Sequence, residues 1–145
     1  MEYHYSRINL SKTNYSLLDK DKVTVLKNWS FEELNDIYVR YCRHKKFKSV
    51  MPIFLEDYKD NEILGYYDDN GQLVAWSMML LYPSQLSVVA DQFAWNYHNP
   101  KLRLGIVSLE HECAYYKSLG YKYLYLQRAD QYKKNFAGFE ILGPA

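Results

Sequence analysis

Hydrophobic and polar residues recur along this chain with the two periods that distinguish helices from strands. A stripe at three- and four-residue steps is formed by Leu34, Ile37, Tyr38 and Tyr41. Apolar residues at this spacing share one face of a helix, so the stripe predicts a helix that begins after Ser30. Glu33 follows Ser30 at the spacing of a capping box, which strengthens this prediction.

The next segments predict a short helix and an antiparallel hairpin. Proline is favoured in the first turn of a helix, so Met51-Pro52 predicts a second helix that continues through IFLEDY. Two strand-like runs then flank Asp69-Asn70-Gly71, the residue types that a tight turn requires. QLSVVADQFAWNY, at residues 85–97, predicts a further strand, and residues 1–10 and 22–26 are candidate short strands.

A second helical stripe predicts a helix over residues 101–119. It is formed by Leu102, Ile106, Leu109, Cys113 and Tyr116. Gly120 ends this helix, and YKYLYLQ, DQYKKNF and FEIL follow as a strand, a short helical segment and a last strand. A strand, a helix and a strand in succession imply a crossover between parallel neighbours. The predicted class is α+β, with a mixed, mostly antiparallel sheet and helices on both faces.

Composition narrows the class of protein. The chain has 145 residues, which suits a single domain over 1–145, and its 18 Lys and Arg nearly balance its 17 Asp and Glu. This balance argues against a broadly basic nucleic-acid-binding protein. No apolar run has the length of a membrane span, and the distant Cys42 and Cys113 are expected to be reduced thiols. We therefore expect a cytoplasmic protein without a metal or a membrane contact.

The start of the 101–119 helix carries charges that oppose the helix dipole. Lys101 and Arg103 stand at the positive end of the helix. Gly105 has no side chain, so a ligand can approach the backbone closely there. Free N–H groups at such a position attract phosphate or another anion. The expected anion-binding residues are Lys101, Arg103, Leu104, Gly105 and Ile106. The alternative is that two surface cations precede an ordinary core helix.

The order of the predicted elements, together with RLGIV at residues 103–107, resembles the GNAT acyltransferase superfamily. Its members hold the coenzyme A pyrophosphate with a basic-x-x-Gly-x-Gly loop at this position, and RLGIV keeps one of the two glycines. NGQLVAW, LSVVADQFAWNYHNPKLRLG, SLGYKYLYL and YKKNFAGFEIL are similar to a narrower group. This group is the C-terminal GNAT-like domain of arginyl-tRNA–protein transferases and bacterial aspartate/glutamate leucyltransferases. The arginyltransferase-like resemblance is strongest over residues 62–142.

The resemblance implies transfer of an acyl or aminoacyl group to an amine, either a protein N-terminus or a small molecule. Such a reaction needs a base, donors for the oxyanion and an acid for the leaving group. The implied catalytic residues are Asp91 as base or ammonium anchor, Tyr132 as acid, and His98. Substrate contacts are expected from Gln92, Trp95 and Gln127. The structural alternatives are an ion pair for Asp91 and plain packing for Tyr132, one of 16 tyrosines.

Two charged clusters have simpler explanations. Glu110-His111-Glu112 diverge by about 100° per residue on a helix, so they cannot converge on one metal ion and are expected to be solvated. A basic cluster near the end of the first helix is formed by Arg40, Arg43, His44, Lys45, Lys46 and Lys48. It either completes the helix dipole in solvent or contacts a tRNA acceptor stem, on whose 3′ end Tyr41 and Phe47 would stack.

Three functions remain open on the sequence alone. The first is acyl or aminoacyl transfer to an amine, the second is acetyl-CoA-dependent N-acetylation, and the third is a non-catalytic binding module of the same fold. The acyl donor is accordingly acetyl-CoA or aminoacyl-tRNA, with tRNA as a candidate partner. The single loop glycine favours the aminoacyl and binding functions over acetyl transfer.

Overall fold

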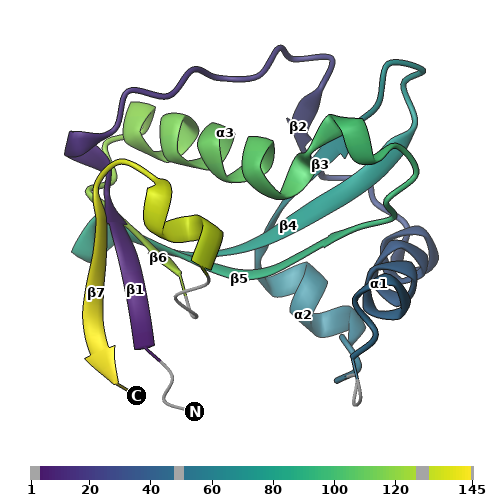
Figure 1. The fold of residues 1–145 in the computed structure, drawn as a ribbon. Coiled ribbons are helices and arrows are strands. Elements are labelled where there is room, and N and C mark those ends of the chain that lie inside the picture. The colour runs from purple at the N-terminus through teal and green to yellow at the C-terminus, as the bar shows by residue number, and fades with distance from the viewer. Residues whose placement is uncertain (1–3, 48–50, 127–130, 145) are drawn as a thin grey trace. The chain divides into compact units, whose positions relative to one another are not determined.

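The computed structural model describes residues 4–47, 51–126 and 131–144 (Figure 1). The strands are β1 (His4–Asn9), β2 (Val23–Val25), β3 (Glu62–Tyr67), β4 (Leu73–Tyr82), β5 (Ser87–Trp95), β6 (Tyr123–Leu126) and β7 (Phe139–Pro144). The α-helices are α1 (Phe31–Lys45), α2 (Leu55–Asp60) and α3 (Leu104–Ser118). Short 3-10 turns are η1 (Leu10–Lys12), η2 (Pro83–Gln85), η3 (Pro100–Leu102) and η4 (Gln131–Asn135).

The strands pair in the order β2-β3-β4-β5-β6-β1-β7. β3 and β4 form the expected antiparallel hairpin, with Glu62 opposite Met79 and Tyr67 opposite Leu73. β5 and β6 are parallel, as the strand–helix–strand order predicted. The α+β class with a mixed, mostly antiparallel sheet is therefore confirmed.

The chain divides into two compact units. The terminal unit contains Met1–Leu17, Leu80–Asp91 and Ser108–Ala145, and the central unit contains Leu18–Met79 and Gln92–Val107. β4, β5 and α3 each contribute residues to both units.

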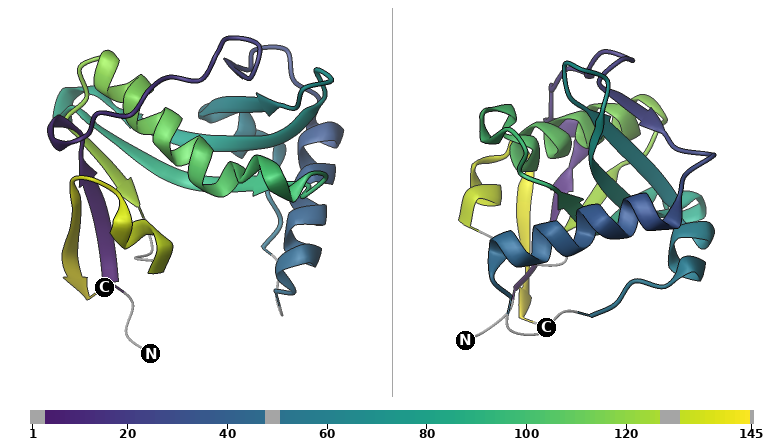
Figure 2. Two further views of the ribbon diagram at one scale, coloured as in Figure 1. Left: turned by 45° about the horizontal axis from the view of Figure 1, so that its top comes forward. Right: turned by 90° about the vertical axis from the view of Figure 1, so that its right-hand side faces the viewer.

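In the terminal unit, β1 inserts between β6 and β7 and pairs antiparallel with both (Figure 2). Arg7 connects the three strands: its guanidinium donates to Glu140 at 2.7 Å and to the Tyr125 hydroxyl at 3.1 Å. Before β7 the chain passes very close to β1, where a Cβ on Gly138 would lie 2.4 Å from the Asn9 carbonyl oxygen. Only glycine fits there, so Gly138 permits this strand order.

In the central unit, α1 and α2 pack on β3 and β4 around the fully buried Trp76. The indole N–H of Trp76 donates to the Leu34 carbonyl at 2.8 Å. The Tyr58 ring of α2 packs edge-on against this indole at 5.2 Å between centroids. Both helices are therefore anchored to the same strand by one side chain.

Two helix starts differ from the sequence prediction. α2 begins at Leu55 rather than at Pro52, because Ile53 is buried and the Asp57 carboxylate accepts from the Phe54 N–H at 3.0 Å. α3 begins at Leu104 rather than near residue 101. The α1 boundary is confirmed, with Ser30 as the N-cap, and Gly120 follows α3 with a φ of 94°.

The sequence analysis also expected reduced thiols at both cysteines and no membrane-spanning segment. Cys42 and Cys113 are free and buried. No helix among the described residues combines the length and the apolar character needed to cross a membrane.

The buried hydroxyls of Tyr58 and Tyr38 provide a matched test of this core. Within the described ranges the Tyr58 hydroxyl has no hydrogen-bond partner, whereas the Tyr38 hydroxyl donates to the Met51 carbonyl at 2.6 Å. We expect Tyr58→Phe to leave the free energy of unfolding unchanged or to raise it by up to about 1 kcal/mol, and Tyr38→Phe to lower it by about 1 kcal/mol. Urea denaturation measures both. Equal losses in the two variants would show that the Tyr58 hydroxyl is bonded to a buried water.

Candidate donor site at the start of helix α3

The segment that leads into α3 is a tight turn followed by a left-handed residue. Asn99 accepts from the Lys101 N–H through its side chain at 3.2 Å, and Pro100 opens the 3-10 turn η3. Arg103 then has a φ of 49°, and α3 begins at Leu104. Lys101 and Arg103 therefore precede the helix instead of lying in its first turn. The reason is local, since the Asn99 side chain and the fixed φ of Pro100 both favour a separate turn.

The backbone N–H groups of this segment divide into two sets. The Leu102 and Arg103 N–H groups donate to the carbonyls of Asn99 and Pro100, at 3.0 and 3.1 Å. The Ile106 N–H donates to the Arg103 carbonyl at 3.1 Å. Among the described residues, the Leu104 and Gly105 N–H groups form no hydrogen bond to the preceding turn, as is usual in the first turn of a helix. Gly105 is half-exposed, whereas Leu104 is buried, with 5% of its surface accessible. The segment therefore has two adjacent N–H groups without a backbone acceptor at the positive end of a 15-residue helix.

The space and charge around these two donors also suit an anion. A Cβ built on Gly105 would meet no atom within 4 Å, so the protein itself does not require glycine at this position. Lys101 and Arg103 are exposed, and neither forms an ion pair with a carboxylate in the part of the chain that the structure describes. Two mobile cations and two fixed N–H groups can together hold a phosphate or pyrophosphate.

A strained residue precedes this loop. Tyr97 has a φ of 55°, which is costly for a side chain of this size, by roughly 1–3 kcal/mol. The His44 ring stacks on it at 3.6 Å between centroids, and Trp95 lies 4.1 Å away on the same measure. This packing offsets the strain and fixes the direction in which the chain enters the loop. No sequence pattern had singled out Tyr97, because backbone strain has no composition signal.

The other predicted site residues are divided between the units. In the central unit with the loop, Gln92 and His98 are exposed, whereas Trp95 is buried, with 5% of its surface accessible. Asp91 and Tyr132 belong to the terminal unit, where Tyr132 lies in η4. Gln127 lies outside the described residues.

The position of Asp91 follows from the pairing of β5. The parallel ladder joins Ser87–Ala90 to Tyr123–Leu126. Asp91 follows directly after the described part of that ladder, and its side chain is partly buried.

The expectation for residues 110–112 is wrong for two of the three. His111 and Glu112 are buried, with 5% and 4% of their surfaces accessible, and only Glu110 is half-exposed. The N-terminal segment runs along α3, where Lys117 donates to the Thr13 carbonyl (Figure 1). The buried positions of α3 therefore extend beyond the stripe that the sequence predicted, because tertiary contacts add to those of a single face. No three His, Cys, Asp or Glu side chains gather as a metal site among the described residues.

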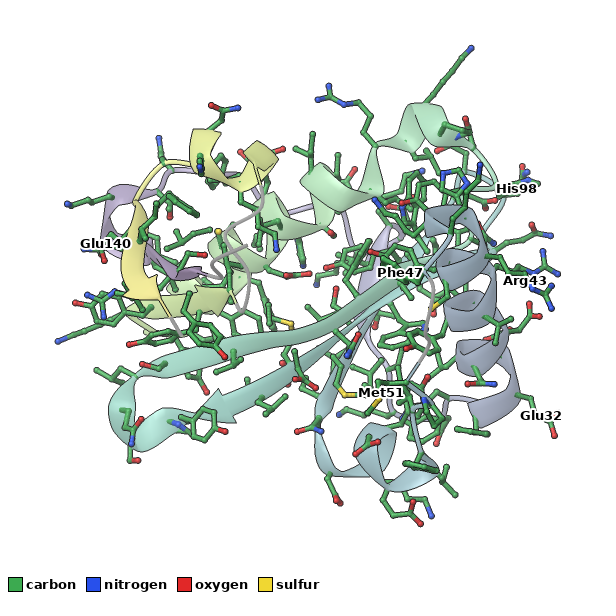
Figure 3. All side chains as sticks on the ribbon, turned by 60° about the horizontal axis from the view of Figure 1, so that its bottom comes forward. Glu32, Arg43, Phe47, Met51, His98 and Glu140 are labelled. Atoms are coloured by element: carbon green, nitrogen blue, oxygen red, sulfur yellow. The ribbon has the colours of Figure 1, made fainter. Side chains whose placement is uncertain are left out.

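The basic cluster of α1 is exposed and joins the aromatic packing of the loop. Arg43 points away from the helix (Figure 3), and Arg40 pairs with Asp36 on the same helix at 3.0 Å. Phe47 packs edge-on against Tyr41, which in turn stacks on Tyr97 with ring centroids 6.0 Å apart. Lys48 lies outside the described residues. The cluster and the candidate donor loop therefore belong to the same unit and share Tyr97.

Comparisons with known proteins connect this fold to acyltransferases. No protein-family model and no curated protein sequence matches the chain. Among solved structures, L-PGS from Bacillus licheniformis matches with a TM-score of 0.65 and 17% identity over 88% of this chain. The C-terminal domain of a putative lysylphosphatidylglycerol synthetase from Agrobacterium fabrum matches with the same TM-score and 12% identity. The chain spans 46% of each of these two structures.

A third structure belongs to the expected superfamily by its own description. It is a putative GNAT-family acetyltransferase from Novosphingobium aromaticivorans, with a TM-score of 0.61 and 13% identity over 97% of this chain and 60% of that one. These likenesses establish the fold: the chain adopts the GNAT fold that the sequence resemblance implied. The narrower resemblance to arginyl-tRNA–protein transferases stays a prediction.

Burial of His111 has a measurable consequence for stability. Burial lowers the pKa of His111 to about 4, below its ordinary value of 6.5. Between pH 6.5 and 4, His111 therefore binds a proton in the unfolded chain but not in the folded chain. The free energy of unfolding should fall as the pH drops through this range, by up to roughly 3 kcal/mol from this group.

His111→Gln removes this titration while leaving Glu112 in place. We expect the variant to show a smaller loss of unfolding free energy than the parent chain between pH 6.5 and 4, measured by urea denaturation at several pH values. Because both proteins contain Glu112, its contribution cancels in the difference. Parallel pH profiles would refute a neutral buried imidazole.

Proposed function

We propose that this chain is an acyl- or aminoacyltransferase whose donor binds by its phosphates at the start of α3. The observation that carries the proposal is the pair of free N–H groups at Leu104 and Gly105, flanked by the exposed Lys101 and Arg103. Gly105 is half-exposed, and the space that a Cβ would occupy there is open. The GNAT fold supports the same reading, since structures that share it are described as acetyltransferases.

The reaction assigns distinct roles to the remaining residues. The acceptor amine loses a proton and attacks the acyl carbonyl carbon, so that a C–N bond forms. The bond from that carbon to the leaving sulfur or oxygen breaks, and the leaving atom takes up a proton. Asp91 is the proposed base or ammonium anchor, Tyr132 the acid, and His98 an exposed alternative for proton transfer. Gln92, Trp95 and Gln127 are the proposed substrate contacts.

The donor is either an aminoacyl-tRNA or acetyl-CoA, and one observation favours the former. The stack of His44 on Tyr97 joins the basic end of α1 to the chain two residues before the turn that opens the donor loop, within one unit. A polynucleotide donor would engage both, with phosphates on the cations and an unpaired base near Tyr41 and Phe47. The acceptor is an amine on a protein N-terminus or a small molecule, and the proposed location is cytoplasmic.

Donor binding is the first test of this function. We expect a charged tRNA to raise the melting temperature, with an effect that decreases steeply with salt, and acetyl-CoA to raise it less. Substituting both Lys101 and Arg103 by Ala should weaken donor binding by about tenfold or more, because two charge-assisted contacts are lost. Lys59→Ala, an exposed lysine on α2, is the matched control.

Each outcome of this experiment assigns a different function. A larger shift with acetyl-CoA than with tRNA would assign N-acetylation. Binding of either donor without product, and with unchanged behaviour in Asp91→Asn and Tyr132→Phe, would assign a non-catalytic binding module. Equal donor affinity in the double variant and the parent chain would rule out the loop as the phosphate site.

Gly105→Ala separates stability from donor binding. Alanine is the better helix former and meets no neighbour here, so the free energy of unfolding should stay constant or rise by up to about 1 kcal/mol. The added methyl group occupies the space through which a phosphate would reach the Leu104 and Gly105 N–H groups, so donor affinity should fall. Urea denaturation and donor titration on the same sample measure the two effects. A variant that gains stability and keeps full donor affinity would contradict close approach at Gly105.

A further inference from the structure

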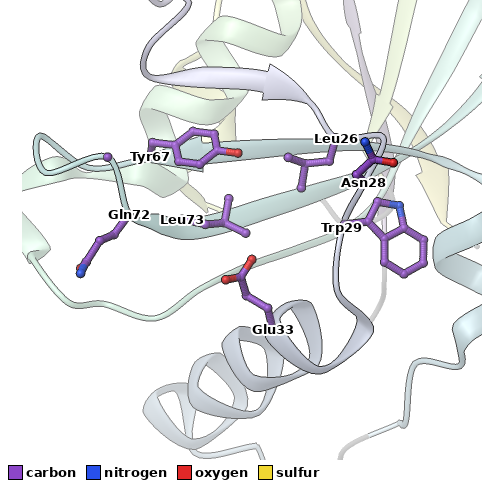
Figure 4. A pocket seen from close by; sticks show the side chains of 8 residues that line it. Leu26, Asn28, Trp29, Glu33, Tyr67, Gln72 and Leu73 are labelled. Carbon is purple, nitrogen blue, oxygen red and sulfur yellow. The ribbon is translucent and has the colours of Figure 1, made fainter.

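A pocket of about 440 Å³ opens in the central unit between the start of α1 and the ends of β3 and β4 (Figure 4). Its walls include Leu26, Trp29, Glu33, Tyr67, Gln72 and Leu73. All of these residues belong to the central unit. The volume lies in the range of small-molecule sites, and the proposed acyl transfer assigns no role to this pocket.

The lining of the pocket has a single formal charge. Leu26 and Leu73 supply aliphatic surface, Trp29 an indole face, and Tyr67 and Gln72 neutral polar groups. Among the described residues that line it, Glu33 is the only carboxylic acid, and none is a lysine, an arginine or a histidine. The Glu33 side chain is exposed at the mouth of the pocket. A ligand that matches this surface carries one positive charge on an otherwise apolar body.

Glu33 is directed into the pocket because it does not complete the capping box that the sequence predicts. Ser30 accepts from the Glu33 N–H at 3.3 Å, which is half of that motif. The return bond from the Ser30 N–H to the Glu33 carboxylate does not form among the described residues. The carboxylate instead extends toward β3 and β4 (Figure 4). The Glu33 carboxylate also acts on Tyr67, another residue of the lining. Burial is the main cause that raises the pKa of Tyr67, and the negative charge of Glu33 is the second.

The walls are held in place by contacts outside the pocket. Leu26 packs directly on the backbone of Gly65, where an added Cβ would lie 2.8 Å from its side chain. Trp29 packs against the buried ring of Tyr58 at 5.6 Å between centroids. The buried Asp68 accepts from the Asn70 and Gln72 N–H groups, both at 2.9 Å, and so fixes the turn at the rim. These contacts fix the apolar walls and the turn before a ligand binds, which lowers the entropy cost of binding.

We propose that this pocket binds a small organic cation, with a protonated amine at the Glu33 carboxylate and an apolar or aromatic body between Trp29, Leu26 and Leu73. The proposal rests on the pocket alone and holds whether or not the chain transfers acyl groups. The N-terminal dipole of α1 opposes a cation, but a full carboxylate charge outweighs the half charge of a helix end.

Benzylammonium is a suitable probe, because benzyl alcohol and phenylacetate have similar shapes with no charge and with the opposite charge. In ¹H–¹⁵N NMR titrations we expect benzylammonium to shift the amide signals of the pocket residues and the Trp29 indole signal. Benzyl alcohol should bind about tenfold more weakly and phenylacetate more weakly still. Added salt should weaken benzylammonium binding.

Glu32 and Glu33 provide matched variants on the same helix turn. Glu32 does not line the pocket, and its side chain points away from the rest of the protein (Figure 3). Glu33→Gln should weaken benzylammonium binding about tenfold, whereas Glu32→Gln should leave it within about twofold, although both remove one charge from the α1 dipole. Trp29→Ala should also weaken it, and all three variants are checked for folding by their amide spectra.

Several results would overturn the proposal. These are equal affinity for benzylammonium and benzyl alcohol, equal losses in Glu33→Gln and Glu32→Gln, amide shifts confined to residues outside the pocket, and no shift at saturating probe. None of them bears on the donor loop, so failure here is distinguishable from failure of the proposed function.

Discussion

Burial of the Trp76 indole is the constraint on which the central unit depends. A buried N–H without an acceptor costs roughly 1–3 kcal/mol, so the indole requires the Leu34 carbonyl that it meets at 2.8 Å. That bond fixes α1 on β4, and the rings of Tyr38 and Tyr58 pack around the same indole. α1 and β4, which supply Glu33 and Leu73 to the pocket, are positioned from this core.

Residues of this core also position two aromatic side chains outside it, Trp29 and Tyr97. Tyr58 supports Trp29, which forms a wall of the Glu33 pocket. Ala94 of β5 belongs to the same buried cluster, and three residues later Tyr97 stacks on Tyr41 of α1. Side chains outside the core are thus oriented by contacts that lead back to it.

Local signals in the sequence predicted most of the elements and failed where contacts are non-local. The Asp69-Asn70-Gly71 turn, the Ser30 cap and Gly120 are encoded within a few residues, and each was placed correctly. The insertion of β1 between β6 and β7 joins residues more than 110 positions apart, and no local pattern encodes it. The burial of His111 and Glu112 was missed for the same reason, because it depends on tertiary contacts that the helical pattern does not encode.

The candidate ligand positions are the places where local preference and structure disagree. Tyr97 adopts a backbone conformation that suits glycine, Gly105 stands where alanine would make a better helix, and Glu33 forgoes its capping bond. Packing accounts for the first, since His44 and Trp95 hold Tyr97. Among the described residues, no packing contact explains the other two. Residues that give up local stability without a packing reason are expected at functional sites.

Gly105 lies beside free N–H groups and cations, and Glu33 lies beside an indole and aliphatic surface. One unit therefore carries two exposed regions of opposite charge, the cations before α3 and the carboxylate of Glu33.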